Sequence, residues 1–139
     1  DALLATAVIL EIPNDISKPT KWVNAGHPAG YWIDANHLIT TLNPTGPMLG
    51  GFGGEWLSQE IFFSAGDRIV LVSDGLLETQ DENGEEFGTQ GLVTSVVTGE
   101  RTGDSAELTN LIVSTARQDS VTWNRDDVSV VVITRRLGE

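Results

Sequence analysis

Aspartates at two places in the sequence have the chemical type and position of ligands for a hard divalent cation. Asp74 comes two residues after the apolar run Ile69 to Val72, and Asp126 and Asp127 come just before a second apolar run, residues 128–133. If the two runs are antiparallel neighbouring strands, these carboxylates meet at one edge of a sheet. Magnesium and manganese prefer such oxygen ligands. The pattern predicts a metal site at this edge.

The structural alternatives are a helix-capping role for Asp74 and a solvated strand-entry loop at Asp126 and Asp127. A carboxylate at the end of an apolar strand is expected to be partly desolvated, which is costly unless the group is paired, capped or bound to a cation. Each alternative explains the acids at only one of the two places. The two places together are better evidence for a metal site than either alone, and the solvated loop stays open as the alternative.

The loop after Asp74 carries five more acids: Glu78, Asp81, Glu82, Glu85 and Glu86. A calcium loop of the EF-hand type needs an acid or amide at its first position and a glutamate at its twelfth. With Gly84 as the loop glycine, Thr79 stands first and Gln90 twelfth, so the pattern fails at both ends. The segment "DENGEE" instead predicts a polar turn around Asn83 and Gly84.

Composition narrows the class of protein further. The chain has 139 residues, is 40% hydrophobic and carries a net charge of -12, which predicts one domain and argues against nucleic acid or an anionic membrane as a partner. It has no cysteine, which excludes disulfides and thiolate chemistry. No apolar run approaches the roughly 18 to 20 residues of a membrane span, so a cytoplasmic protein is the default expectation. Because the chain starts at Asp1 without an initiator methionine, we expect it to be part of a longer protein.

Short apolar segments separated by Asn, Gly and Pro predict mostly antiparallel strands. They cover residues 21–25, 30–34, 37–41, 59–63, 67–74 and 128–134, and residues 3–11 form either a strand buried on both faces or a helix end. The strand at 128–134 is also expected to be buried. Helices are predicted over 88–97 and over 104–118, the second with Asp104 as N-cap and Glu107 completing a capping box. This content predicts an α+β fold in which helices cover a sandwich of two sheets.

Neither histidine forms a recognisable catalytic constellation. His27 could be a base, a metal ligand or a turn residue, and its neighbours Gly26 and Pro28 favour the turn. His37 stands in an expected hairpin strand. No serine has the histidine and third group of a Ser-His-Asp hydrolase in a recognisable spacing. The glycine-rich segment at residues 46–54 is not a phosphate loop, because no Gly-Lys-Ser/Thr follows it.

Four segments taken together resemble a known family. "VNAGHPAGYWI", "GPMLGGF", "FSAGDRIVLVSDGLLETQDENGEEFG" and "RDDVSVVVI" are similar, in order and spacing, to motifs of the bacterial SpoIIE/RsbU branch of the metal-dependent protein phosphatases, the PPM or protein phosphatase 2C superfamily. The resemblance implies two antiparallel sheets flanked by helices (α-β-β-α) and two ions, Mn²⁺ or Mg²⁺. These ions activate a water that attacks a phosphoserine or phosphothreonine.

The resemblance also assigns residues. Asp74 and Asp126 match metal ligands, and Gly75 would let the backbone turn beside the ion. Asp127, His27 and Asn24 would lie next to the ligands or in turns.

Other aspartates of the family's metal site belong to an N-terminal portion that has no counterpart in residues 1–139. The resemblance therefore implies a single partial domain over 1–139, about the C-terminal two thirds of the whole. Two carboxylates alone would hold a magnesium-class ion weakly, so this part taken alone is expected to be a poor enzyme. We also expect partner chains or self-association, because a sandwich without its first strands leaves edges and apolar faces uncovered.

Two functions follow from the resemblance. The first is a signal-transduction hydrolase, a protein-serine/threonine phosphatase acting on a phosphorylated regulatory protein. An anti-sigma factor antagonist in a bacterial stress or developmental switch is the expected substrate, with a sensory or receiver domain upstream in the parent protein. The alternative is a degenerate phosphatase fold that binds partners in a response regulator without catalysis.

Overall fold

The computed structural model describes residues 3–99, 104–123 and 125–136. The chain divides into two compact units, Asp1–Arg68 with Arg135–Glu139, and Ile69–Thr134. Each unit is described by itself. Within the described ranges, no helix is both long and apolar enough to cross a membrane.

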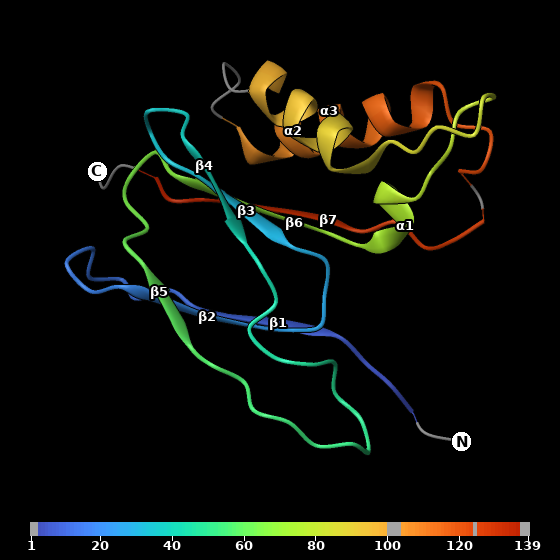
Figure 1. Cartoon of the computed structure of the whole chain (residues 1–139). Helices are drawn as coiled ribbons and strands as arrows, with labels where there is room; N and C mark the ends of the chain where they lie inside the picture. The colour runs from blue at the N-terminus through green and yellow to red at the C-terminus, as the bar shows by residue number, and fades with distance from the viewer. Residues whose placement is uncertain (1–2, 100–103, 124, 137–139) are drawn as a thin grey trace. The chain divides into compact units, whose positions relative to one another are not determined.

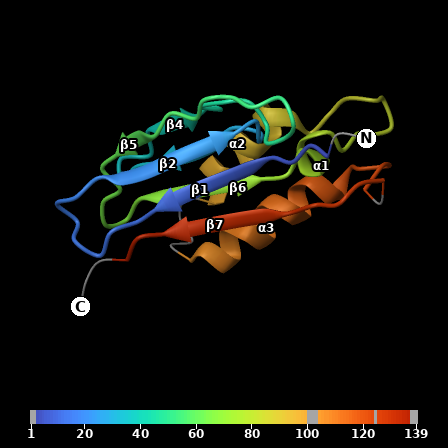
Figure 2. The same ribbon diagram turned by 90° about the horizontal axis from the view of Figure 1, so that it is seen from below.

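The first unit contains a three-stranded antiparallel sheet and a hairpin. β1 (Ala7–Glu11) pairs with β2 (Thr20–Ala25), which pairs with β5 (Gln59–Ile61), so β2 is central. The hairpin joins β3 (Gly30–Ile33) to β4 (Ile39–Leu42). Figure 2 shows β1 alongside β2. These strands confirm the predicted antiparallel segments, with no end shifted by more than four residues.

The second unit packs helices against two strands. It is built from β6 (Arg68–Val72), α1 (Asp74–Leu77), α2 (Gly88–Gly99), α3 (Ser105–Gln118) and β7 (Val130–Thr134). Figure 1 shows α2 and α3 over one face of β6 and β7. Their apolar side chains form the core of the unit. Six of them are 0% exposed: Ile69, Val70, Leu76, Leu92, Leu108 and Ile112.

β6 and β7 are antiparallel neighbours, as the metal-site hypothesis requires. Ser73 N–H donates to Ser129 O (2.9 Å) where β6 ends and β7 begins. At the opposite ends, Arg135 N–H donates to Asp67 O (3.1 Å). β6 and β7 are thus neighbours in a second antiparallel sheet. The α+β class with two antiparallel sheets is therefore confirmed.

Both predicted helices are present. α3 begins after Asp104, whose side chain accepts a hydrogen bond from Ala106 N–H (2.9 Å), an N-cap contact that satisfies one of the helix's first free N–H groups. α2 starts at the predicted residue and extends to Gly99, two residues beyond the prediction.

Two burial predictions were wrong. The run at 3–11 forms a strand only over β1, where Ile9 is 65% exposed, and Val131 of β7 is 49% exposed. Both strands lie at the edge of their sheet, and successive side chains of a strand point to opposite faces. Apolar composition alone therefore overstated the burial of one face in each strand.

Candidate metal site

Ser73 joins the end of β6 to the segment that carries Asp126 and Asp127. Its hydroxyl donates to Asp127 O (3.1 Å) and accepts from Ser129 N–H (2.8 Å). Its own N–H donates to Ser129 O. These bonds fix the 126–127 segment against the start of α1.

Gly75 allows the two segments to approach this closely. A Cβ atom at this position would lie 2.4 Å from Asp127 O and 3.3 Å from Asp126 Cβ, far inside normal contact distances. Gly75 is not among the described glycines with positive φ. Glycine is therefore needed here because any side chain would collide with the backbone of Asp127. The resemblance had implied a different reason, a turn of the backbone beside the ion.

Asp74 and Asp126 each keep one carboxylate oxygen without a protein partner. Asp74 Oδ1 accepts from Gly75 N–H (3.0 Å), and Asp126 Oδ1 accepts from Asp127 N–H (2.7 Å). Neither Oδ2 forms a hydrogen bond or ion pair with any residue that the structure describes. Both residues are exposed, so the expected desolvation of Asp74 was wrong.

The capping alternative does not account for Asp74. Ser73 occupies the N-cap position of α1 and makes no side-chain cap bond, and Asp74 is the first residue of the helix. Its carboxylate bonds only the adjacent N–H, whereas a cap bonds the second or third N–H of the helix. The local structure thus leaves the outer oxygen available.

The donor set suits a hydrated hard cation. Within the described ranges, no cluster of three or more His, Asp or Glu side chains is positioned to hold a metal ion. Mg²⁺ characteristically keeps several waters and binds through one or two protein carboxylates. Two neighbouring segments that each offer a free oxygen fit that kind of ion, and they do not form a complete protein cage.

The structure gives the other predicted residues hydrogen bonds within the protein. Asp127 is exposed and contributes its carbonyl to Ser73. Asn24, which is 1% exposed, accepts from His27 N–H (2.8 Å) and donates to Pro28 O (3.4 Å). His27 Nδ1 lies 2.9 Å from Thr6 Oγ1. Asn24 and His27 belong to the first unit, where they form a turn, and a place for them beside the metal stays a prediction.

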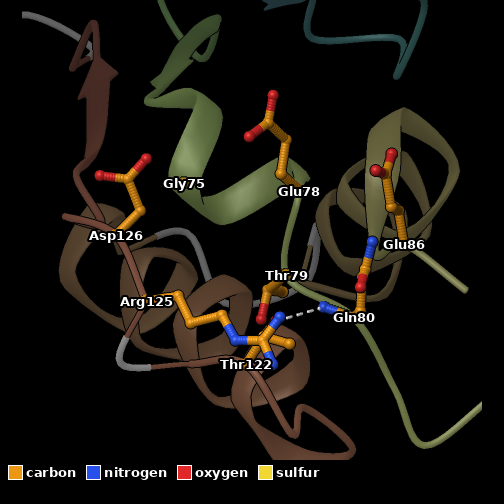
Figure 3. Close-up of a pocket in the computed structure, with 8 residues that line it drawn as sticks. All are labelled: Gly75, Glu78, Thr79, Gln80, Glu86, Thr122, Arg125 and Asp126. Atoms are coloured by element: carbon orange, nitrogen blue, oxygen red, sulfur yellow. Dashed lines mark hydrogen bonds between the residues drawn. The ribbon is translucent and has the colours of Figure 1, made fainter. Parts of the chain in front are cut away.

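A cavity of about 280 Å³ opens next to Gly75 and Asp126 (Figure 3). Its other lining residues are Glu78, Thr79, Gln80, Glu86, Thr122 and Arg125. The sequence analysis did not single out Glu78 or Arg125 as site residues. Their spacing offered a signal, because Glu78 stands one helical turn after Asp74 and Arg125 directly precedes Asp126.

The acid-rich loop forms the predicted turn. Asp81 Oδ1 accepts from Asn83 N–H (2.8 Å) and Glu85 N–H (2.9 Å), and Gly84 has φ +80°. Asp81 is thus used as a turn acceptor, which is the role that Asp favours in such loops.

These bonds give an expected pH dependence. The Glu85 N–H, followed by the Asn83 N–H, holds the pKa of the Asp81 carboxyl below its ordinary value of 3.8. A lowered folded pKa stabilises the turn above pH 3.8, and this stabilisation is lost as pH falls through the folded pKa. Carboxyl chemical shifts of Asp81 followed by NMR during acid titration should show this. A pKa at or above 3.8 would contradict the turn geometry.

Comparison with known proteins identifies relatives of the chain. Residues 1–136 match the family described as Stage II sporulation protein E (SpoIIE). Phosphoserine phosphatase RsbP of Bacillus subtilis (strain 168) is 35% identical over 75 residues, which are 52% of this chain and 18% of RsbP.

Two solved structures show the same fold. The manganese-presoaked phosphatase domain of SpoIIE from Bacillus subtilis has a TM-score of 0.71 at 19% identity, over 96% of this chain and 58% of that one. The catalytic domain of the serine/threonine phosphatase PstP with 2 manganese ions has a TM-score of 0.59 at 17% identity. The match covers 91% of this chain and 56% of that one.

The chain therefore spans less than two thirds of the length of these relatives. The match over residues 1–136 is nonetheless almost the whole chain. Together with the shared fold, it shows that the chain belongs to the SpoIIE family.

Proposed function

We propose that the parent protein is a metal-dependent protein phosphatase that hydrolyses phosphoserine or phosphothreonine on a regulatory protein. The observation that carries the proposal is the contact of the Asp74–Gly75 segment with the Asp126–Asp127 segment, which leaves one free carboxylate oxygen on each side. RsbP is named a phosphoserine phosphatase and PstP a serine/threonine phosphatase. These names support the same chemistry and do not favour a non-catalytic module.

Asp74 and Asp126 would hold Mn²⁺ or Mg²⁺, with two ions in the complete domain. A bound divalent ion lowers the pKa of coordinated water and polarises phosphoryl oxygens. The chain's own residues set the geometry: Gly75 permits the close approach, and Ser73 fixes the two segments by its hydroxyl bonds. The SpoIIE and PstP structures with manganese support the choice of metal.

The regulatory partner is proposed from the resemblance to the SpoIIE/RsbU branch. An anti-sigma factor antagonist is the proposed substrate, and a sensory or receiver domain the proposed upstream neighbour. The chain matches only 18% of RsbP, which supports the view that residues 1–139 are one part of a single domain in a longer regulatory protein.

The test is Asp74→Asn in the complete parent protein, assayed by manganese-dependent hydrolysis of a phosphoserine peptide. We expect turnover to fall about 100-fold or more, since even residues that only support metal ligands typically cost about 10- to 100-fold. Titration calorimetry should show weaker manganese binding. Asp74 is exposed, so the variant should fold.

Glu82→Gln is the matched control, because it removes an exposed carboxylate of the same unit for which the structure shows no hydrogen bond. It should leave turnover and manganese affinity unchanged. Unchanged turnover in Asp74→Asn would refute the proposed function.

A further inference from the structure

One basic group lines the cavity beside the candidate metal site. Of its described lining residues, Arg125 is the only cation, and Glu78, Glu86 and Asp126 are anions. Figure 3 shows Arg125 among the residues that line the cavity, together with the carboxylates of Glu78, Glu86 and Asp126. The cavity wall therefore carries three acidic side chains and one basic side chain.

The guanidinium group of Arg125 forms no hydrogen bond or ion pair with any residue in the described part of the chain. The side chains of Arg117 and Arg135, by contrast, have protein partners. Arg117 lies over the Trp123 ring at 5.9 Å, and Arg135 donates to Phe63 O (3.1 Å) and Pro13 O (2.6 Å). In a chain with 20 acids against 8 basic residues, a guanidinium that lines a cavity with three carboxylates and pairs with none is available to a ligand.

The backbone that carries Arg125 is anchored. Arg125 N–H donates to Thr122 O (2.9 Å), and Val121 N–H donates to Gln80 O (2.8 Å). Gln80 N–H in turn donates to Thr122 Oγ1 (2.8 Å). Arg125 is thus held at the cavity wall, one residue from a proposed metal ligand.

We propose that Arg125 binds an anionic oxygen group of the phosphoprotein substrate. This inference rests on the proposed function and assigns a specificity residue to the same site. A guanidinium recognises carboxylate and phosphate oxygens in a bidentate geometry. The carboxylates in the cavity repel an anion, and Arg125 is the protein group there that attracts one. The anion is either the phosphoryl group itself or an acidic side chain next to the phosphoserine.

The test uses Arg125→Gln in the complete parent protein and three probes. Two are fluorescent phosphoserine peptides that differ only in glutamate or glutamine beside the phosphoserine, and the third is p-nitrophenyl phosphate. Peptide binding is measured by fluorescence anisotropy and hydrolysis by KM and kcat. We expect binding of the glutamate peptide to weaken about tenfold and KM to rise by a similar factor, with kcat nearly unchanged, as for loss of one charged hydrogen-bond pair.

The three probes distinguish the source of the anion. A loss confined to the glutamate peptide assigns Arg125 to the flanking carboxylate, and an equal loss for all three probes assigns it to the phosphoryl group. Arg136→Gln, which removes the same charge from an exposed residue outside this cavity, should change nothing.

Equal peptide binding by Arg125→Gln and the unchanged protein would overturn the inference. Because binding needs no turnover, this result is separate from a failure of the proposed function. That failure would appear as a parent protein that binds the peptides without hydrolysing them in manganese.

Discussion

Gly75→Ala is expected to remove most metal-dependent activity without touching any proposed ligand. The new methyl group would lie 2.4 Å from Asp127 O and 3.3 Å from Asp126 Cβ. Backbone atoms cannot rotate away as a flexible side chain can, so the 126–127 segment has to move away from α1. A displacement of about 1 Å near reacting groups can reduce the rate about 100-fold. Overpacking of this kind also destabilises a protein by about 1–3 kcal/mol.

The measurements are manganese affinity by titration calorimetry, turnover, and thermal unfolding of the complete parent protein. Gly51→Ala is the matched control, because a Cβ there meets no atom within 4 Å and the residue is not among those with positive φ. It should leave all three quantities unchanged. If Gly75→Ala binds manganese as tightly as the unchanged protein, Asp74 and Asp126 do not share an ion across this contact.

The sequence located the two strands behind the candidate site, and their antiparallel pairing was a condition of the hypothesis that the structure meets. Ile69 to Val72 and residues 128–133 are short, nearly continuous apolar runs bounded by acids, and such runs indicate strands. Once β6 and β7 are antiparallel neighbours, Asp74 and Asp126 must come to the same edge. The helix around Asp104 was equally predictable, because its cap is a contact between residues that are close in the chain.

The solvent exposure and contacts of individual side chains were less predictable, because they depend on how the helices and strands are arranged in space. Asp74 was expected to be partly desolvated, but α1 starts at that residue and places its carboxylate in solvent. Ile9 was expected to be buried, but β1 is an edge strand with one open face. Arg125 lies outside every predicted helix and strand, so no hydrophobic periodicity could indicate where its side chain would be placed. Its position depends on the hydrogen bonds that join residues 121–122 to Gln80.

Asp67 is the clearest residue that sequence reasoning passed over. It stands in "GDRIVLV" directly before β6. From the sequence alone it cannot be distinguished from Asp74, the acid that follows the same strand. In the structure it is 2% exposed. Its carboxylate accepts from Ser64 N–H (2.7 Å), Ala35 N–H (3.0 Å) and Trp32 Nε1–H (3.0 Å). All of these groups lie in the first unit, so Asp67 ties the β3–β4 hairpin to the turn before β6.

Asp67→Ala is expected to cause the largest loss of stability. A buried donor left without an acceptor costs about 1–3 kcal/mol, and three part-buried N–H groups lose their acceptor here, so we expect a loss of a few kcal/mol. That loss is a large fraction of the roughly 5–15 kcal/mol by which a domain is stable. Urea unfolding of the parent protein, followed by tryptophan fluorescence, measures it, and Trp32 reports from inside the network.

Asp34→Ala is the matched control. It removes a carboxylate that accepts backbone N–H groups in an exposed turn, so it shows how much of the loss in Asp67→Ala comes from burial. Asp34 Oδ1 also accepts two backbone N–H groups, from Asn36 (2.8 Å) and Leu38 (2.9 Å), but in an exposed turn where water can replace it. It should therefore cost about 1 kcal/mol, in the range of an ordinary hydrogen bond. Equal losses for Asp34→Ala and Asp67→Ala would mean that water reaches the three donors around Asp67. In that case the hairpin would not depend on a buried carboxylate.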